Sequence, residues 1–410
     1  MGGRTKIWAA TVAAMAVALA LGACGEGPGG GGGGGGEGVE TAPSSPPKMP
    51  DSPVTLNVLD VAGNLQLTKA AIEKYKQENP KAARRITFTT ATAPELAGKV
   101  KAQQKAGRLD IDLVLTGTDG LAAGISQGLW LKGLPGIDPG LDAPYLEPAA
   151  KMQEQAEDQG VVVTYYPSGP LLEYMPDRVQ DPPTTPQALL AWAKENPGKF
   201  MYARPSNSGP ARTFLMGLPY LLGDKDPRDP INGWDKTWAY LKELGKYVDY
   251  YPSGTKDTMS GLADGSRDMI ASTTGWDINP RALGTVPKEA KVAAFDDLHW
   301  VTDAHYMVVP KGIAEDKLAV VVDLMKFMLE PEQQALAYDD GYFYPGPAIK
   351  DVGIDMAPAK SQKVIEEFGR PEYEQLIESK PKETPLLGKA LVDAFDKWDR
   401  EVGGSKVKED

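Results

Sequence analysis

The residue with the most distinctive chemistry in this sequence is Cys24, the single cysteine among 410 residues. It directly follows Gly22 and Ala23, and small residues before a scissile bond suit a signal peptidase. A cysteine at the first mature position supplies a thiol that can carry a lipid. A lone cysteine forms no intrachain disulfide and builds no cysteine-based metal site. We therefore expect Cys24 to be a lipidation site.

The segment before Cys24 has the composition of a secretory signal. Arg4 and Lys6 supply a short positive region, and the following stretch Ile7–Leu21 carries no charge. That stretch is long enough for the apolar part of a signal peptide and too short to span a bilayer comfortably. The four residues that end at Cys24 resemble the bacterial lipobox; the alternative is an ordinary signal peptide with a chance cysteine. The sequence thus predicts a lipoprotein signal peptide over residues 1–23 and a lipid anchor at the outer face of the cytoplasmic membrane.

Patterns for catalysis or metal binding are weak elsewhere. His299 and His305 are six residues apart, which is neither of the common helical spacings for metal ligands. The sequence has no G-x-S-x-G elbow, H-E-x-x-H motif, phosphate loop or dinucleotide fingerprint. The pairs Tyr165–Tyr166 and Tyr250–Tyr251 allow tyrosinate ligation of iron, but adjacent tyrosines are common in half-buried strands. We expect no resident cofactor, no metal and no enzymatic activity.

The region after Cys24 has the composition of a tether. Gly29–Gly36 is an unbroken glycine run, and residues containing Pro and Ser follow it up to Pro53. Such a segment buries too little apolar surface to offset its ordering entropy. We expect residues 24–53 to be a flexible leash. A formal net charge of −12 disfavours nucleic acid and anionic lipid surfaces as partners.

Strand-like and helix-like patterns alternate after Pro53. Apolar or alternating runs typical of strands cover residues 54–59, 86–90, 111–115, 161–166, 200–203, 269–273 and 306–310. Helical spacing and stop signals cover residues 65–79, 95–106, 185–196, 234–248, 317–329, 332–338 and 387–402. The alternation predicts an α/β fold with helices covering mixed sheets, and the length suggests two lobes.

Several short stretches in a fixed order carry a family resemblance. They are Leu109–Val114, Gly128–Leu131, Met259–Gly265, Val309–Gly312, Phe327–Ala335 and Gly341–Tyr342. Together they resemble the bacterial extracellular solute-binding proteins of family 1, the substrate-binding lipoproteins of ABC transporters. The resemblance covers roughly Val54 to Val402. Each stretch alone is a weak signal, and their order and spacing make the resemblance specific.

The resemblance implies the type II periplasmic-binding-protein fold, in which two α/β lobes close on a ligand about a hinge. Lobe I would comprise residues 54–164, lobe II residues 165–305, and residues 306–410 would return to lobe I and supply the C-terminal helices. The open form would exchange ligand and the closed form would be recognised by permease subunits. The partners implied are a small-molecule solute and the permease of an ABC importer, and the protein would be a monomer.

The position of the cleft selects candidate ligand contacts, because ligands of α/β lobes sit outside the carboxyl ends of strands. The loops at these ends and at the two crossings between lobes supply Asn64, Thr116, Thr118, Asp119, Tyr166, Ser206, Asn207, Ser208, Trp276, Asp277, His305 and Tyr306. Each has a structural alternative. The serines could serve only as a helix cap, Trp276 as a core residue and His305 as a hinge residue.

The sequence does not identify the ligand. A tryptophan beside a carboxylate, as at Trp276 and Asp277, suits a sugar face or a cation. A sugar, a polyamine, a thiamine-like cation, a metal chelate and a small peptide all fit the scaffold. The alternative function is a secreted lipoprotein enzyme that acts on polymer or cell-wall material through paired carboxylates.

Overall fold

The computed structural model describes residues 38–61 and 63–408. The expected signal peptide, Cys24 and the glycine run therefore lie outside the described residues. In the part that is described, no helix is both long enough and apolar enough to cross a membrane.

Lobe I is built on a sheet with strand order β10-β9-β3-β1-β2, in which β4 also pairs with β9. Its strands are β1 (Val54–Asp60), β2 (Ala83–Thr90), β3 (Leu113–Gly117), β4 (Val161–Gly169), β9 (Trp300–Val308) and β10 (Lys382–Glu383). Strand β1 runs parallel to β2 and β3, whereas β9 runs antiparallel to β3 and β4. Strand β3 is buried along its whole length, as a central strand covered on both faces should be.

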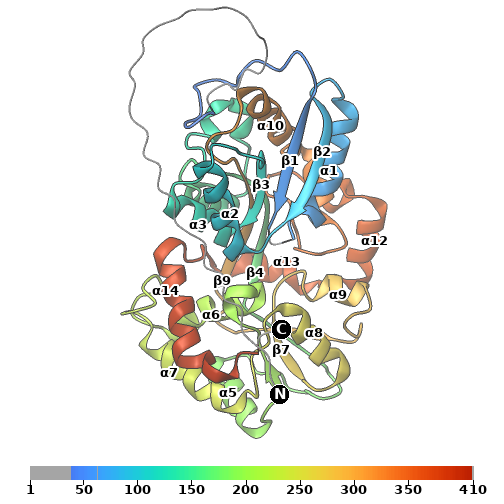
Figure 1. Ribbon diagram of the computed structural model, residues 1–410. Coiled ribbons are helices and arrows are strands. Elements are labelled where there is room, and N and C mark those ends of the chain that lie inside the picture. Colours follow the sequence, from blue (N-terminus) through green and yellow to red (C-terminus); the bar gives the residue numbers. More distant parts are fainter. Residues whose placement is uncertain (1–37, 62, 409–410) are drawn as a thin grey trace, which may run out of the picture. The chain divides into compact units, whose positions relative to one another are not determined.

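Helices cover this sheet. They are α1 (Leu65–Glu78), α2 (Ala93–Lys105), α3 (Thr118–Gln127), α4 (Glu147–Gln155), α10 (Glu315–Met328) and α11 (Pro331–Gln334). Helix α1 buries Leu67, Ala71, Ile72 and Tyr75, whose spacing of three and four residues forms one apolar face. Helices α1 and α10 pack together beside β1 and β2, and α2 and α3 pack together beside β3 (Figure 1).

Lobe II has a second sheet with strand order β6-β7-β5-β8. Its strands are β5 (Leu171–Tyr174), β6 (Phe200–Met201), β7 (Met269–Ser272) and β8 (Lys291–Ala294). Its helices are α5 (Pro186–Glu195), α6 (Gly209–Leu222), α7 (Asp235–Leu244), α8 (Thr255–Asp264) and α9 (Ile278–Ala282). Helix α6 packs on β7 and also on β4 and β9, so it sits where the two lobes meet.

Strands β4 and β9, which we call the crossing strands, carry the chain between the lobes. They pair antiparallel from Val161 opposite Met307 to Gly169 opposite Val301, and all their residues are buried. The strand expected at residues 306–310 therefore starts earlier, at Trp300. The paired strands β4 and β9 therefore form a continuous connection between the two lobes.

The C-terminal helices, whose docking the sequence leaves open, do not all lie with lobe I. After α12 (Ala359–Phe368), α13 (Glu372–Ser379) and β10, helix α14 (Gly388–Trp398) packs into the core of lobe II. The Trp398 indole N–H donates a hydrogen bond of 3.2 Å to the Tyr202 hydroxyl, and Tyr251 packs on the same ring. The physical reason is that Leu391, Ala394 and Trp398 form an apolar face of α14 that is buried in the core of lobe II. Figure 1 shows α14 beside α7, in lobe II.

Residues 38–53, which we call the strap, lie on lobe I. The Val39 N–H donates to the Ile313 carbonyl at 2.8 Å, and the Gly312 N–H donates back to Val39 at 2.8 Å. The Ala42 N–H donates to the Lys132 carbonyl at 3.0 Å. The stretch expected to be a flexible tether is thus hydrogen-bonded to lobe I at Val39 and Ala42.

Candidate ligand-binding site

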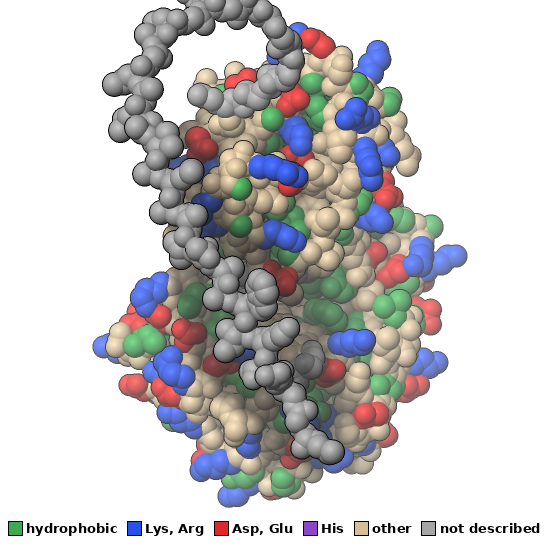
Figure 2. All heavy atoms as spheres, in the orientation of Figure 1, with side chains coloured by type: hydrophobic (Ala, Val, Ile, Leu, Met, Phe, Trp, Pro, Cys, Tyr) green, Lys and Arg blue, Asp and Glu red, His purple; other side chains and the backbone are tan. Residues whose placement is uncertain are grey.

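A cavity of about 630 Å³ lies where loops of both lobes meet the crossing strands. This volume is within the range of small-molecule sites. Figure 2 shows hydrophobic side chains gathered in the hollow between the two lobes on this face, with charged side chains of both signs around it. The cavity is lined by residues from β3, α3, β4, α6, β9, the start of α8 and two aromatic loops.

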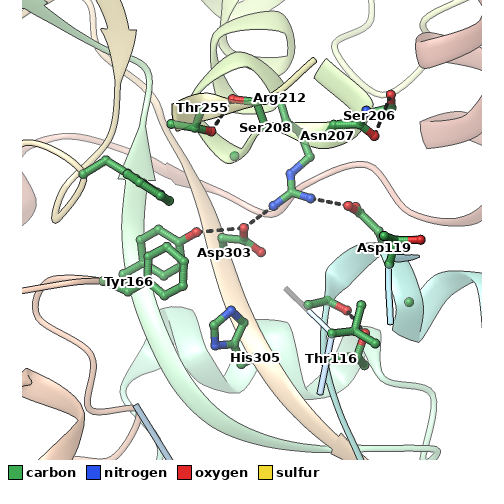
Figure 3. A pocket seen from close by; sticks show the side chains of 18 of the residues that line it. Thr116, Asp119, Tyr166, Ser206, Asn207, Ser208, Arg212, Thr255, Asp303 and His305 are labelled. Carbon is green, nitrogen blue, oxygen red and sulfur yellow. Dashed lines mark hydrogen bonds and ion pairs between the residues drawn. The ribbon is translucent and has the colours of Figure 1, made fainter. Parts of the chain in front are cut away.

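Eight of the twelve candidate contacts line this cavity. They are Thr116, Asp119, Tyr166, Ser206, Asn207, Ser208, Trp276 and His305. They come together because the carboxyl ends of β3 and β7, the start of α6 and the middle of both crossing strands all open on the same space. Figure 3 shows this gathering around a central arginine, Arg212.

Two of the other four candidates have structural partners instead. Asp277 is fully buried and forms an ion pair of 2.7 Å with Arg370, a residue that follows α12. Thr118 is also fully buried and donates a hydrogen bond of 2.7 Å to Asp303. Neither side chain is part of the cavity lining, so the expectation of direct ligand contact does not fit their positions.

Asn64 and Tyr306 are buried away from the cavity. Asn64 lies directly before α1, and neither polar atom of its side chain has a hydrogen-bond partner among the described residues. The Tyr306 hydroxyl donates to the Met152 carbonyl at 3.1 Å. Successive side chains of a strand point to opposite faces, so Tyr306 points away from the face that His305 presents to the cavity.

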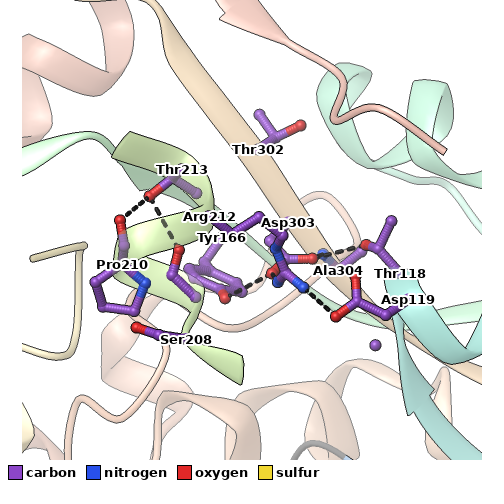
Figure 4. A network of polar contacts seen from close by, with 12 residues as sticks. Thr118, Asp119, Tyr166, Ser208, Pro210, Arg212, Thr213, Thr302, Asp303 and Ala304 are labelled. Carbon is purple, nitrogen blue, oxygen red and sulfur yellow. Dashed lines mark hydrogen bonds and ion pairs between the residues drawn. The ribbon is translucent and has the colours of Figure 1, made fainter. Parts of the chain in front are cut away.

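The centre of the site is a buried cluster of charges around Arg212. Arg212 Nη1 lies 2.6 Å from Asp119 Oδ2, and the other terminal nitrogen contacts Asp303 Oδ2. The Tyr166 hydroxyl donates to the same oxygen of Asp303 at 3.0 Å. Figure 4 shows that the arginine comes from α6 of lobe II, Asp119 from α3 of lobe I, and Asp303 from crossing strand β9. The cluster therefore joins all three parts of the molecule.

The two carboxyl groups of this cluster differ in their electrostatics. Burial raises the pKa of Asp119, and the nearby charge of Asp303 raises it further, although Arg212 opposes both effects. Burial also acts on Asp303, but the charge of Arg212 and the hydrogen bonds from Thr118 and Tyr166 hold its pKa below the usual value. Asp303 is therefore the stable counter-ion of Arg212.

His305 is a neutral polar group in the wall of the cavity. Burial lowers the pKa of His305 to about 4, even though the charge of Asp303 acts in the opposite direction. Its side chain is 2% exposed, and Nδ1 has no hydrogen-bond partner in the described ranges. With a neutral His305, two carboxylates face one guanidinium, and the formal charge of the cavity is −1.

An aromatic wall closes another side of the cavity. Tyr166 stacks on Phe343 with ring centroids 4.5 Å apart, and His305 meets the edge of the same ring at 5.0 Å. Trp276 packs against Tyr342 at 5.5 Å. Such a wall suits the apolar or planar part of a ligand.

The N-terminal ends of four helices also line the cavity. The lining includes Thr92 before α2, Gly117 before α3, Ser208 before α6 and Gly254 before α8. The hydroxyls of Ser208 and Thr255 are 2.8 Å apart and link the starts of α6 and α8. Gly254, the residue before α8, has no side chain that could cap the N–H groups of the first turn of this helix.

The structure adds residues that the sequence reasoning missed, chiefly Arg212, Asp303, Thr255, Tyr342 and Phe343. Two of them carry a signal in the sequence. Arg212 lies near the start of α6, where a helix dipole disfavours a cation, so its position implies an acidic partner. Asp303 is a charged residue inside a fully buried strand, and buried charges are paired.

The tyrosine pairs considered for iron do not converge. Tyr166 lines the cavity, whereas Tyr251 lies in the core of lobe II against Trp398. Tyr250 lies in the second lobe as well, under the ammonium group of Lys408. The four hydroxyls therefore do not form one ligand set.

Comparison with solved structures places this architecture among known binding proteins. The periplasmic binding protein AfuA from Actinobacillus pleuropneumoniae, with exogenous fructose-6-phosphate bound, matches with a TM-score of 0.62 and 15% identity, over 85% of this chain and 98% of that chain. A putative spermidine/putrescine ABC transporter protein from Listeria monocytogenes matches with a TM-score of 0.57 and 17% identity, over 85% and 98%. These likenesses confirm the two-lobed type II periplasmic-binding-protein fold.

Sequence comparison identifies the family. Protein YnjB of Escherichia coli strain K12 is 28% identical over 193 residues, which are 43% of this chain and 47% of that protein. The match thus spans about half the length of this relative. Residues 70–364 match the family model described as bacterial extracellular solute-binding protein. Because that match covers most of the chain, the protein belongs to the bacterial extracellular solute-binding protein family.

Proposed function

We propose that this protein captures a small polar solute outside the cytoplasmic membrane and delivers it to the permease of an ABC importer. The observation that carries the proposal is the cavity around Arg212, whose lining includes residues of both lobes and of the crossing strands. A solute in that cavity contacts lobe I and lobe II at once. Family membership supports the same class of function.

The two-lobe construction supplies a mechanism for capture. A solute that contacts Thr116 on lobe I and Ser208 on lobe II binds the closed arrangement better than an open one. Its differential affinity for the two arrangements sets how far it shifts the equilibrium toward closure. The closed form is then the species that the permease recognises.

We assign ligand contact to the eight candidate residues in the lining and add Arg212 and Thr255. Asn64, Thr118, Asp277 and Tyr306 receive structural roles, because they are buried outside the lining. In particular, Thr118 orients Asp303, and Asp277 holds the chain that follows α12 through Arg370.

We further propose that the mature protein is a monomer held at the outer face of the membrane by lipid on Cys24. The support is the composition of residues 1–23 and the small residues before the cysteine. An enzyme with paired carboxylates is less favoured, because the family model that matches the chain describes solute-binding proteins and Arg212 forms an ion pair with both Asp119 and Asp303.

Native mass spectrometry of protein purified without refolding tests solute capture. We expect a co-purified solute in the wild type, its loss in Asn207→Arg, and its retention in Asn232→Arg. Asn207 and Asn232 are both exposed asparagines of lobe II, but only Asn207 lines the cavity. A solute that is equally present in Asn207→Arg would exclude this cavity as the capture site.

A further inference from the structure

The two carboxylates that hold Arg212 are not equivalent. Asp303 Oδ1 accepts from Thr118 at 2.7 Å and from the Ala304 N–H at 2.9 Å, and Oδ2 accepts from Tyr166 and Arg212. Both of its oxygens are thus satisfied. Asp119 uses only Oδ2, and its buried Oδ1 has no hydrogen-bond partner in the described part of the chain. Both oxygens of Asp303 thus accept hydrogen bonds, whereas Asp119 is held by one oxygen only.

Asp119 is also the more accessible of the two carboxylates. Its side chain is 24% exposed, whereas that of Asp303 is 5% exposed. It lies in the first turn of α3, and a carboxylate there is stabilised by the helix N-terminus in any case. Burial raises the pKa of Asp119, so contact with water would favour its ionised form. The carboxylate therefore keeps a favourable position after it separates from Arg212.

The field around the arginine attracts an anion once Asp119 has moved. Arg212 and Asp303 then cancel in formal charge. The N-termini of α2, α3, α6 and α8 line the cavity. Each helix N-terminus carries a partial positive charge. The starts of α2 and α6 are already capped by Thr92 with Glu95 and by Ser208, whereas Gly254 at the start of α8 offers no side-chain cap. The helix ends thus favour an anion, and the first turn of α8 can supply N–H donors beside the Ser208 and Thr255 hydroxyls.

A second feature of the cavity, independent of the helix ends, also calls for a ligand. His305 lines the cavity and is almost fully buried, with 2% of its surface exposed. Its Nδ1 has no hydrogen-bond partner among residues 38–61 and 63–408. Buried polar atoms are normally satisfied. A hydroxyl or amide of a bound solute would satisfy this nitrogen (Figure 3).

We infer that Asp119 occupies the place of an anionic group of the solute, and that the cavity takes small molecules bearing a phosphate or a carboxylate. The anionic group displaces Asp119 from Arg212 and lies against the starts of α6 and α8. The rest of the solute lies against His305 and the aromatic wall of Trp276, Tyr342 and Phe343. This inference rests on the proposed function and adds the class of solute to it.

Asp119→Asn tests the inference with inorganic phosphate as the anionic probe and putrescine as the cationic probe. The variant is nearly isosteric and leaves Arg212 paired with Asp303, so the fold should be kept; a thermal unfolding curve checks this. Because the competing charge is removed, we expect Asp119→Asn to bind phosphate about tenfold more tightly than the wild type in calorimetric titration. The matched control is Asp142→Asn, which removes one exposed negative charge of lobe I outside the cavity lining and should leave phosphate binding unchanged.

A cation site would give the opposite pattern, with putrescine bound by the wild type and more weakly by Asp119→Asn. That result, or phosphate binding that is absent, unchanged or weaker in Asp119→Asn, overturns the inference. The proposed function is tested separately, by native mass spectrometry of the co-purified solute. A solute that lacks an anionic group but depends on Asn207 rejects only the anionic class. If no solute depends on the cavity, the proposed function itself fails.

Discussion

Asp119 Oδ2 and Arg212 Nη1 lie 2.6 Å apart and form an ion pair between α3 of lobe I and α6 of lobe II. The Arg212 side chain is 12% exposed, so this contact is formed largely away from water. A buried pair is screened by salt much less than a surface pair. The pair therefore favours approach of the lobes before any solute enters.

Arg212→Gln should open the unliganded molecule. The substitution removes the attraction between the lobes and leaves two carboxylates facing each other. We expect a larger radius of gyration in small-angle scattering, and a free energy of unfolding lower by about 3–5 kcal/mol, because a buried charge loses its partner. The control is Arg400→Gln, since Arg400 is an exposed arginine in the turn after α14. A folded variant with an unchanged radius would show that the pair does not hold the lobes together.

Trp276→Ala should weaken solute binding by about 1–3 kcal/mol, as expected for loss of an aromatic anchor. The ring lines the cavity and is only half-buried, so the melting temperature of the empty protein should change little. Trp192→Ala is the matched control, because Trp192 is a half-buried tryptophan of α5 outside the lining. Titration of the co-purified solute and thermal unfolding, measured on both variants, separate the roles. A large loss of stability with unaltered affinity would assign Trp276 to the core.

His305 should make the fold sensitive to acid. Burial lowers the pKa of His305 from the ordinary value near 6.5 to about 4 in the folded protein. Between these two pH values, the histidine is protonated in the unfolded chain and neutral in the folded protein. Stability is therefore full above pH 6.5 and is lost as the pH falls, by on the order of 3 kcal/mol. Urea unfolding at pH 7 and pH 4.5 should show a smaller loss in His305→Gln than in the wild type. His299→Gln is the control, because His299 is a half-buried ring outside the cavity. Equal losses in all three proteins would contradict the assignment.

Cys24→Ser should release the folded globular part from the membrane. The substitution removes the only thiol that could carry a lipid. After cell fractionation, we expect the wild type in the membrane pellet and the variant in the soluble fraction. If the variant stays in the pellet as the wild type does, lipid on Cys24 is not the anchor.

The parts of the site that could be predicted from sequence depend on local order. Residues that follow a buried strand or precede a helix can be recognised in the sequence, and Thr116 and Ser208 were found in this way. The topology of α/β lobes then brings such positions together. Both line the cavity of the structure.

The positions that sequence reasoning did not place have long-range causes. Asp277 was expected in the cleft, but its partner Arg370 lies far along the chain and reaches it only through the final fold. Tyr306 was expected beside His305, but every residue of β9 is buried, so burial shows no alternation from which the facing side could be read. Arg212 was missed because its two carboxylates come from another lobe and from the crossing strand.

The strap determines where a mechanical pull on the N-terminus enters the molecule. The hydrogen bonds between Val39 and the segment Gly312–Ile313 fasten it to lobe I, and its Gly38 lies so close that a side chain there would meet the Gly312 carbonyl at 2.4 Å. A pull on the chain before residue 38 would therefore reach lobe I first and would act on the crossing strands and lobe II only through it.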